Sequence, residues 1–389
     1  MSYRYLLNAF IGLLMLFPFQ VSAQQKIEIN GIILDESNNP IPFVAIGIVE
    51  KYIGTASTED GEFSLLVTKA ELQDSLSISS LGYDPFKIKV ADYLKLTKRE
   101  VVLKESVTEL DEIKILKPSE YVALASKNMK ANTISTPHQI EMLYRRAVTE
   151  GGQPKFLVEN YIKVRDRGPA YYFGLMQVAE SRKSADYRIW KPDQRWHSIN
   201  GMASLHPFRP NDSQHKRNLK KFIWKKIGDS SYEGEDVLIL EGTNSKMTWE
   251  KIKVFIGMNS YKVYRIERGN TLYIYKKHKS GKLVLSYYRH SWKIPKERFP
   301  LHLRNSPASD SDYKAEAFVY KVITDKKQIK VVPYGIDVDM GMIDLPYNAT
   351  FWNNLSVPPD TKFYKKIKDG LEGVYGVSLE DQYKYVNEK

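Results

Sequence analysis

The chain has 389 residues, a hydrophobic fraction of 42%, a formal net charge of +12 and no cysteine. This composition is that of a globular protein with room for two or three domains, and it excludes a disordered chain, a disulfide framework and a cysteine nucleophile. Residues 24–117 contain 11 Lys and Arg against 16 Asp and Glu, a net charge of −5; because Arg4 is the only charged residue before them, residues 118–389 are left with +16. An acidic first part joined to a basic second part favours an anionic partner for the second, although lysines that merely solvate the surface are an equal alternative.

The first 23 residues have the pattern of a secretory signal peptide. Arg4 precedes an apolar run from Leu6 to Phe19, and Val21-Ser22-Ala23 places small residues before a predicted cleavage at Gln24. The run is shorter than the ~20 apolar residues of a membrane-spanning helix, so an uncleaved anchor is the less favoured alternative. We therefore expect an exported protein, periplasmic or at the periphery of the outer membrane, with no nucleic-acid partner.

Residues 24–115 alternate short β-type runs with turn signals. The turns are expected at Asn38-Asn39-Pro40 and Glu59-Asp60-Gly61, where Asn, Pro and Gly favour the required backbone angles. About seven strands are expected, over residues 27–34, 43–48, 54–58, 63–67, 76–79, 86–90 and 100–103. This spacing predicts a small antiparallel β-sandwich.

A series of positions within this part carries a family resemblance: Gly31, Asp35, Pro40, Ala45, Gly54, Thr55, Asp60, Gly61, Phe63, Leu81, Gly82 and Tyr83. In this order they resemble the carboxypeptidase-D regulatory-like domain, a transthyretin-like β-sandwich with a carbohydrate-binding-like fold. The tail from Leu103 to Ile115 is similar to the exit from such domains in envelope proteins of the Bacteroidota, where they often precede TonB-dependent receptors. The resemblance implies a fold and an envelope location but no peptidase activity, because in metallocarboxypeptidases the module accompanies a separate zinc domain.

Residues 116–389 are expected to form a larger, β-rich α+β domain. Ser119 is the predicted N-cap of a helix in which Tyr121, Leu124, Ala125, Asn128 and Met129 recur at helical spacing. Strands are expected over 139–149, 155–164, 171–180, 237–241, 250–256, 261–268, 271–277, 282–292 and 313–324, and helices over 361–368 and 379–385. Their short connections predict one curved antiparallel sheet with the first helix on one face. The layout resembles an uncharacterised region that follows this regulatory-like domain in Bacteroidota, and is similar in topology to the half-barrels of periplasmic lipoprotein carriers.

Two basic-aromatic stretches are the candidate ligand-binding segments. The first, residues 216–227, could form an amphipathic helix on an anionic membrane, or a strand that buries Phe222 and Trp224 and leaves the lysines in solvent; the strand is favoured. The second, residues 190–197, could place aromatic rings against a sugar or could simply anchor a loop. The candidate binding residues in these stretches are Trp190, Arg195, Trp196, Lys220, Lys221, Trp224 and Lys225.

No catalytic motif is evident. Neither a Gly-x-Ser-x-Gly elbow nor a Gly-rich phosphate loop occurs, and no cofactor is expected. His138 and Glu141 have the spacing of a zinc-ligand pair, which a later histidine such as His278 or His290 could complete. Asp337, Asp339 and Asp344 could approach a calcium ion, but their spacing fits no EF-hand loop and favours a solvated turn.

The sequence therefore predicts a non-enzymatic envelope protein whose basic second domain binds an anionic lipid, a glycan or a protein partner, with peripheral membrane association. The alternative from the enzyme class is a metal-dependent hydrolase that uses His138 and Glu141. A third possibility is an assembly module in which the acidic sandwich docks on a transporter or secretion partner.

Overall fold

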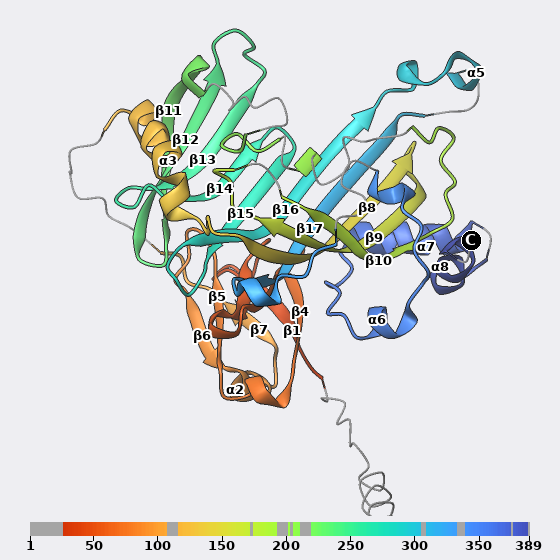
Figure 1. The fold of residues 1–389 in the computed structure, drawn as a ribbon, viewed down its shortest axis with the longest axis horizontal. Helices are drawn as coiled ribbons and strands as arrows, with labels where there is room; N and C mark the ends of the chain where they lie inside the picture. Colours follow the sequence, from red (N-terminus) through yellow and green to blue (C-terminus); the bar gives the residue numbers. More distant parts are fainter. Residues whose placement is uncertain are drawn as a thin grey trace, which may run out of the picture.

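The computed structural model describes residues 26–106, 116–171, 174–192, 201–202, 205–210, 219–304, 309–332, 339–374 and 376–387. Within these ranges the chain is mainly β, with an N-terminal β-sandwich, one long curved sheet and a few short helices (Figure 1). The predicted signal peptide lies outside the described residues. Among the described residues, no helix has both the length and the apolar character needed to cross a bilayer.

The sandwich contains the seven predicted strands: β1 (Ile27–Leu34), β2 (Ala45–Ile48), β3 (Ile53–Ala56), β4 (Glu62–Val67), β5 (Ser75–Ser79), β6 (Phe86–Lys89) and β7 (Glu100–Val102). One sheet has the order β4-β1-β7 and the other the order β3-β2-β5-β6. Between them lies a core of aliphatic side chains with Phe63 and Tyr93, the latter from the short helix α2 (Val90–Tyr93). The prediction of a seven-stranded sandwich is confirmed.

Gly31 shows why one position of the family pattern is glycine. A Cβ atom at this position of β1 would lie 2.2 Å from the Tyr93 hydroxyl and 2.4 Å from the carbonyl oxygen of Arg99. We expect Gly31→Ala to lower the free energy of unfolding of the sandwich by about 1–3 kcal/mol, because the added methyl must push these groups apart. Urea unfolding of the variant measures this loss. Gly373→Ala, at a position without a positive φ angle where a Cβ would meet nothing within 4 Å, tests whether the crowding at Gly31 is the cause.

The second part begins with helix α3 (Pro118–Asn132). The prediction of Ser119 as its N-cap is wrong. The helix starts at Pro118, whose missing N–H costs nothing in the first turn, and the carboxylate of Glu120 accepts a hydrogen bond of 2.8 Å from the backbone N–H of Lys117. The helix buries Tyr121, Val122, Ala125 and Met129 against the long sheet.

The long sheet is antiparallel throughout and has the order β11-β12-β13-β14-β15-β16-β17-β8-β9-β10. Its strands are β8 (His138–Glu150), β9 (Gln153–Asp166), β10 (Met176–Lys183), β11 (Phe222–Tyr232), β12 (Glu235–Asn244), β13 (Lys251–Gly257), β14 (Val263–Arg268), β15 (Thr271–Lys277), β16 (Leu283–Ile294) and β17 (Ser311–Ile323). It curls into a half-barrel, with α3 packed on its inner face over β11 and β13 (Figure 1). The predicted curved antiparallel sheet is confirmed.

The sandwich joins the half-barrel where two neighbouring strands separate. β16 pairs with β17 only as far as Tyr287 and Phe318; beyond this point β16 continues along β15, and β17 continues along β8. The β2–β3 hairpin of the sandwich enters the gap, and Ile53 of β3 pairs with Lys321 of β17. The second sheet of the sandwich is therefore continuous with the half-barrel, below which the sandwich lies in Figure 1.

The C-terminal helices cover the outer face of the sheet at the other end. These are α6 (Ala349–Asn353), α7 (Lys362–Gly373) and α8 (Leu379–Asn387), of which α7 packs on β9 and α8 on β10 (Figure 1). A further helix, α5 (Leu301–Arg304), follows β16. Both predicted C-terminal helices are present, and α7 continues five residues beyond the predicted end at Lys368.

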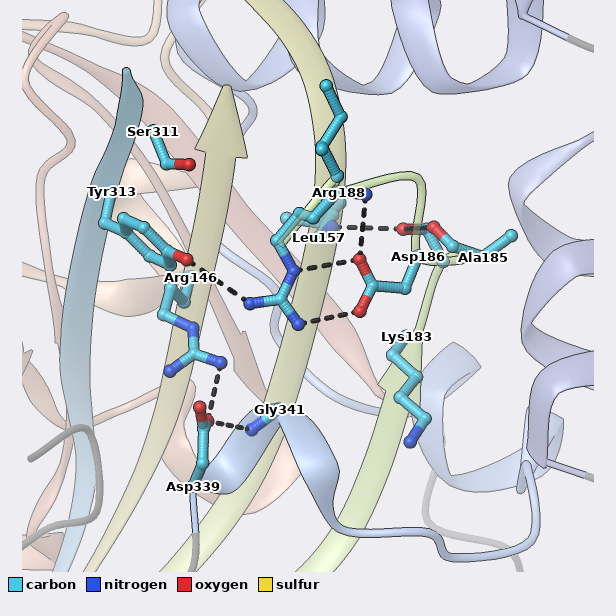
Figure 2. A network of polar contacts seen from close by, with 12 residues as sticks. Arg146, Leu157, Lys183, Ala185, Asp186, Arg188, Ser311, Tyr313, Asp339 and Gly341 are labelled. Carbon is cyan, nitrogen blue, oxygen red and sulfur yellow. Dashed lines mark hydrogen bonds and ion pairs between the residues drawn. The ribbon is translucent and has the colours of Figure 1, made fainter. Parts of the chain in front are cut away.

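Adjacent arginines on β8 mark the two faces of the sheet. Arg145 points outward and Arg146 inward, and both are fully buried. On the inner side, the Arg146 guanidinium donates a hydrogen bond of 2.6 Å to Asp339, whose carboxylate also accepts from the backbone N–H of Gly341 (Figure 2). Nearby, Arg188 makes two hydrogen bonds to Asp186 and a longer one, 3.4 Å, to the Tyr313 hydroxyl (Figure 2). The Arg146–Asp339 pair thus holds the segment after β17 against the sheet, and the hydrogen bond from Arg188 to Tyr313 holds the segment after β10.

Candidate functional site

The edge strand β11 exposes a surface that combines lysines with large apolar side chains. Phe222 and Trp224 point inward and are buried, whereas Ile223 and Lys225 project outward from alternate positions. Ile227, at a bulge between Lys226 and Gly228, is exposed as well. Ile223 is 61% exposed and Ile227 49%, values that are unusual for isoleucine in a strand. The segment 216–227, as far as the structure describes it, therefore follows the strand interpretation and not the amphipathic helix.

The loop between β12 and β13 extends this surface. The backbone N–H of Ser245 donates to the carbonyl of Lys221, which places the loop beside the start of β11. In the loop, Trp249 is 80% exposed and Met247 is 43% exposed. We refer to the exposed residues Lys220, Lys221, Ile223, Lys225, Ile227, Met247 and Trp249 as the edge patch.

The charges of the edge patch differ from those of the neighbouring outer face. On β12 to β14 the cations are neutralised within the sheet: Lys251 lies 3.1 Å from Glu241, and Lys253 lies 3.4 Å from Glu267. Lys225 is the cross-strand neighbour of Glu241, but that carboxylate is engaged by Lys251. Among the described residues no carboxylate forms an ion pair with Lys221 or Lys225, so both ammonium groups are available to an external anion.

The other predicted binding segment is only partly described. Trp190 is half-buried, and its ring packs against Phe299 with the ring centroids 5.0 Å apart. Arg195 and Trp196 lie outside the described residues, so the sugar-binding interpretation of this loop stays a prediction. Trp224, also a predicted ligand contact, is 9% exposed and packs in the core next to Phe222; this prediction is wrong because strand alternation turns the ring inward.

The predicted zinc pair does not converge. His138 and Glu141 are three positions apart on β8, so their side chains point to opposite faces of the sheet. Glu141 accepts hydrogen bonds from Gln139 and from the Tyr161 hydroxyl, whereas His138 is held by the carbonyl of Thr136. In the described part of the chain, no three His, Asp or Glu side chains gather as metal ligands would. The hypothesis of a hydrolase with His138 and Glu141 as zinc ligands is therefore wrong.

The aspartates considered as calcium ligands do not come together either. Asp339 is fully buried and paired with Arg146, and Asp344 forms an ion pair with Lys183. Asp337 lies outside the described residues. These two carboxylates are neutralised by separate cations and hold the chain on the sheet.

The inner face of the half-barrel holds a closed polar network beneath segment 205–210. Arg209 makes two hydrogen bonds to Asp166, of 2.8 and 2.9 Å, and the His206 ring nitrogen lies 2.7 Å from the Tyr275 hydroxyl. Burial lowers the pKa of His206 well below its ordinary value, and Arg209 beside it acts in the same direction. These groups and His138 line a small cavity. Each of them has a partner, so the network fixes the segment on the sheet.

The comparisons with known proteins concern the two parts of the chain separately. No curated protein matches the sequence. Residues 29–115 match the family model of the CarboxypepD_reg-like domain, which confirms the resemblance carried by Gly31, Asp35, Pro40, Gly54, Asp60, Gly61, Phe63, Gly82 and Tyr83.

Solved structures overlap with about half of the chain. An outer membrane lipoprotein-sorting protein domain from Vibrio parahaemolyticus aligns with 11% identity and a TM-score of 0.28, over 52% of this chain and 92% of its own. A DUF1329 family protein from Desulfovibrio piger has 12% identity and a TM-score of 0.27, over 54% and 95%. A LolA superfamily protein from Nitrosomonas europaea has 11% identity and a TM-score of 0.20, over 56% and 96%. No conclusion on function follows from scores this low. The family match and the seven-stranded sandwich together identify residues 29–115 as a CarboxypepD_reg-like domain.

Proposed function

We propose that this protein is a non-enzymatic binding protein of the cell envelope, which attaches to anionic lipid surfaces through the edge patch. The observation that carries the proposal is the presence of Lys221, Ile223 and Lys225 on one exposed strand edge with Trp249 in the loop beside it, and no carboxylate of the described residues paired to the two lysines. Lysine ammonium groups attract phospholipid head groups, and a Trp ring is favoured at the boundary between head groups and acyl chains.

Two further observations support a lipid surface as the partner. Residues 118–389 carry a net charge of +16, so the long-range field of this part attracts an anionic surface of any shape. A strand edge that exposes isoleucines can pair with strands of other molecules, and lysines on the edge oppose such pairing. Attachment to a membrane would cover the exposed isoleucines. The signal-like N-terminus and the CarboxypepD_reg-like domain fit an exported protein.

The proposal is tested by co-sedimentation with vesicles of phosphatidylglycerol and phosphatidylcholine, compared with phosphatidylcholine alone. The wild type is expected to sediment with the anionic vesicles only, and less so at high salt. Lys221→Gln/Lys225→Gln is expected to bind roughly 30-fold more weakly, since each lysine near an anionic surface contributes about 1 kcal/mol.

The matched control is Lys365→Gln/Lys366→Gln on α7, which removes the same two charges from an exposed helix at the opposite end of the sheet (Figure 1). Binding that weakens equally in both double variants would mean that net charge, and not the edge patch, attracts the vesicles. Trp249→Ala tests the apolar contribution and is expected to weaken binding even at high salt. If the wild type binds neither kind of vesicle, the proposal is wrong.

A further inference from the structure

A pocket opens where the sandwich enters the gap between β16 and β17. The pocket, of about 540 Å³ counted to its open mouth, lies between the two parts of the chain. Its apolar wall comes from both of them, with Ile46, Ile48 and Ile53 of the sandwich opposite Val284, Val319 and Val322 of the half-barrel.

Lys276 of β15 is the unpaired cation of this pocket. Its side chain lies against the backbone of the β2–β3 hairpin, where a Cβ atom on Gly54 would lie only 2.7 Å from the Lys276 Nζ atom. Among the described residues, no hydrogen bond or ion pair reaches this Nζ atom. Removal of the ammonium group from water lowers the pKa of Lys276 to about 8. The neighbouring Lys277 also lines the pocket, but it pairs with Glu233 at 3.1 Å and is neutralised.

A second polar group in the pocket wall has no partner among the described residues. His278 is 9% exposed, and its Nδ1 atom accepts a hydrogen bond from the backbone N–H of Ser280. The neutral ring therefore carries its proton on Nε2, which is buried and makes no hydrogen bond. Buried polar groups are normally satisfied, so this N–H and the unpaired ammonium group of Lys276, both in the wall of one apolar pocket, indicate a missing acceptor.

We propose that this pocket binds a single-chain amphiphile with a carboxylate head, such as a fatty acid. The two carboxylate oxygens would accept from Lys276 and His278, and the chain would lie between the isoleucines of the hairpin and the valines of β16 and β17. The single ammonium matches the charge of a carboxylate monoanion, whereas a phosphate dianion would bury an excess negative charge. Because both parts of the chain contribute, the ligand would hold the sandwich on the half-barrel.

Calorimetric titration of the whole purified protein with monomeric dodecanoate tests the proposal. We expect binding of dodecanoate, and no binding of dodecyltrimethylammonium or acetate. Lys276→Met keeps the apolar stem and is expected to weaken dodecanoate binding by about 10- to 100-fold, the effect of one charged hydrogen bond. Lys321→Met, which removes an exposed cation of β17 between two pocket residues, is expected to leave the affinity unchanged. Equal affinity in both variants, or absence of dodecanoate binding to the wild type, would overturn the proposal.

A measurement on the unchanged protein covers the case in which Lys276→Met does not fold. Acetylation of individual lysines by an N-hydroxysuccinimide ester is followed by peptide mass spectrometry at pH 8. Dodecanoate at ten times its Kd is expected to slow the labelling of Lys276 about tenfold and to leave Lys321 unaffected. Unslowed labelling of Lys276 would contradict the proposal. Equal protection by acetate or inorganic phosphate would also contradict it, because the ligand would then be a small anion and not an amphiphile. Since no vesicles are present, either result is independent of the edge patch.

Discussion

Glu316→Gln is expected to lower the free energy of unfolding of the half-barrel by about 3 kcal/mol, because it removes the buried carboxylate paired with the Arg145 guanidinium and leaves only the partly exposed Asp360, 3.8 Å away. Arg145 is fully buried on the outer face of β8, and Glu316 on β17 is 3% exposed. The same carboxylate accepts a hydrogen bond of 2.7 Å from the Tyr287 hydroxyl. The Arg145 guanidinium also lies 3.8 Å from the centre of the Tyr364 ring, so the pair supports the packing of α7.

Urea unfolding followed by tryptophan fluorescence measures this loss in the right part of the molecule. All six Trp residues follow residue 117, so the signal reports the half-barrel and not the sandwich. Glu267→Gln is the control: it removes a partly exposed carboxylate from Lys253 and Arg265, and is expected to cost no more than about 1 kcal/mol. Similar losses in the two variants would show that the Arg145 pair contributes no more than a surface pair.

The double variant Arg145→Met/Glu316→Leu separates the charge from the packing. Replacement of both partners by apolar residues of similar size removes the unpaired charge, and the double variant is therefore expected to be more stable than Glu316→Gln. If the double variant is as unstable as the single one, the loss comes from packing against Tyr364 and not from the isolated guanidinium.

The sequence predicts most of this fold because local signals and burial agree. The β8–β9 hairpin was expected from two alternating runs around Gly151-Gly152, and both glycines have positive φ angles, which they adopt without strain. The strands of the half-barrel follow one another through short polar turns, so neighbours in sequence are neighbours in the sheet. In the sandwich, the family pattern includes crowded positions such as Gly31, where a side chain larger than that of glycine would clash with its neighbours.

The joint between the two parts was not predictable in this way. Nothing in the alternation of β16 and β17 indicates that they separate beyond Tyr287 and Phe318, because the pattern of each strand is satisfied whichever neighbour it has. From the sequence alone, Lys276 therefore cannot be distinguished from an ordinary lysine at the polar end of a strand. Its position in a pocket depends on the sandwich, whose contact with β17 is long-range in sequence.

The candidate site, too, was only partly predictable from the sequence. Phe222 and Trp224 alternate with exposed residues, so the strand interpretation of this segment could be made from the sequence. That β11 lies at the edge of the sheet, and that Trp249 lies in the loop beside it, follows only from the strand order and from the contact between Ser245 and Lys221. The zinc hypothesis failed because residues three apart on a strand face opposite ways, whereas the same spacing on a helix would bring them together.

Acidification from pH 7.5 to 5.5 is expected to lower the free energy of unfolding by about 2–5 kcal/mol through the buried histidines. Burial lowers the pKa of His138, His206, His278 and His290, the last to about 4. In the unfolded chain these rings bind protons near pH 6.5, so the unfolded state takes up more protons than the folded state as the pH falls through this value. Each such histidine can contribute up to about 1.4 kcal/mol per pH unit. Urea unfolding at pH 7.5, 6.5 and 5.5 measures the slope.

His206 and its hydrogen-bond partner allow the titration to be separated from the contact. His206→Phe removes a titrating ring and is expected to flatten the dependence on pH, whereas Tyr275→Phe removes the 2.7 Å hydrogen bond, keeps the buried imidazole and should lower stability about equally at every pH. Burial raises the pKa of Glu150 and of Glu180, which opposes the loss only as these carboxyls become protonated at lower pH. A wild type whose stability does not change between pH 7.5 and 5.5 would mean that the four rings are accessible to protons in the folded protein.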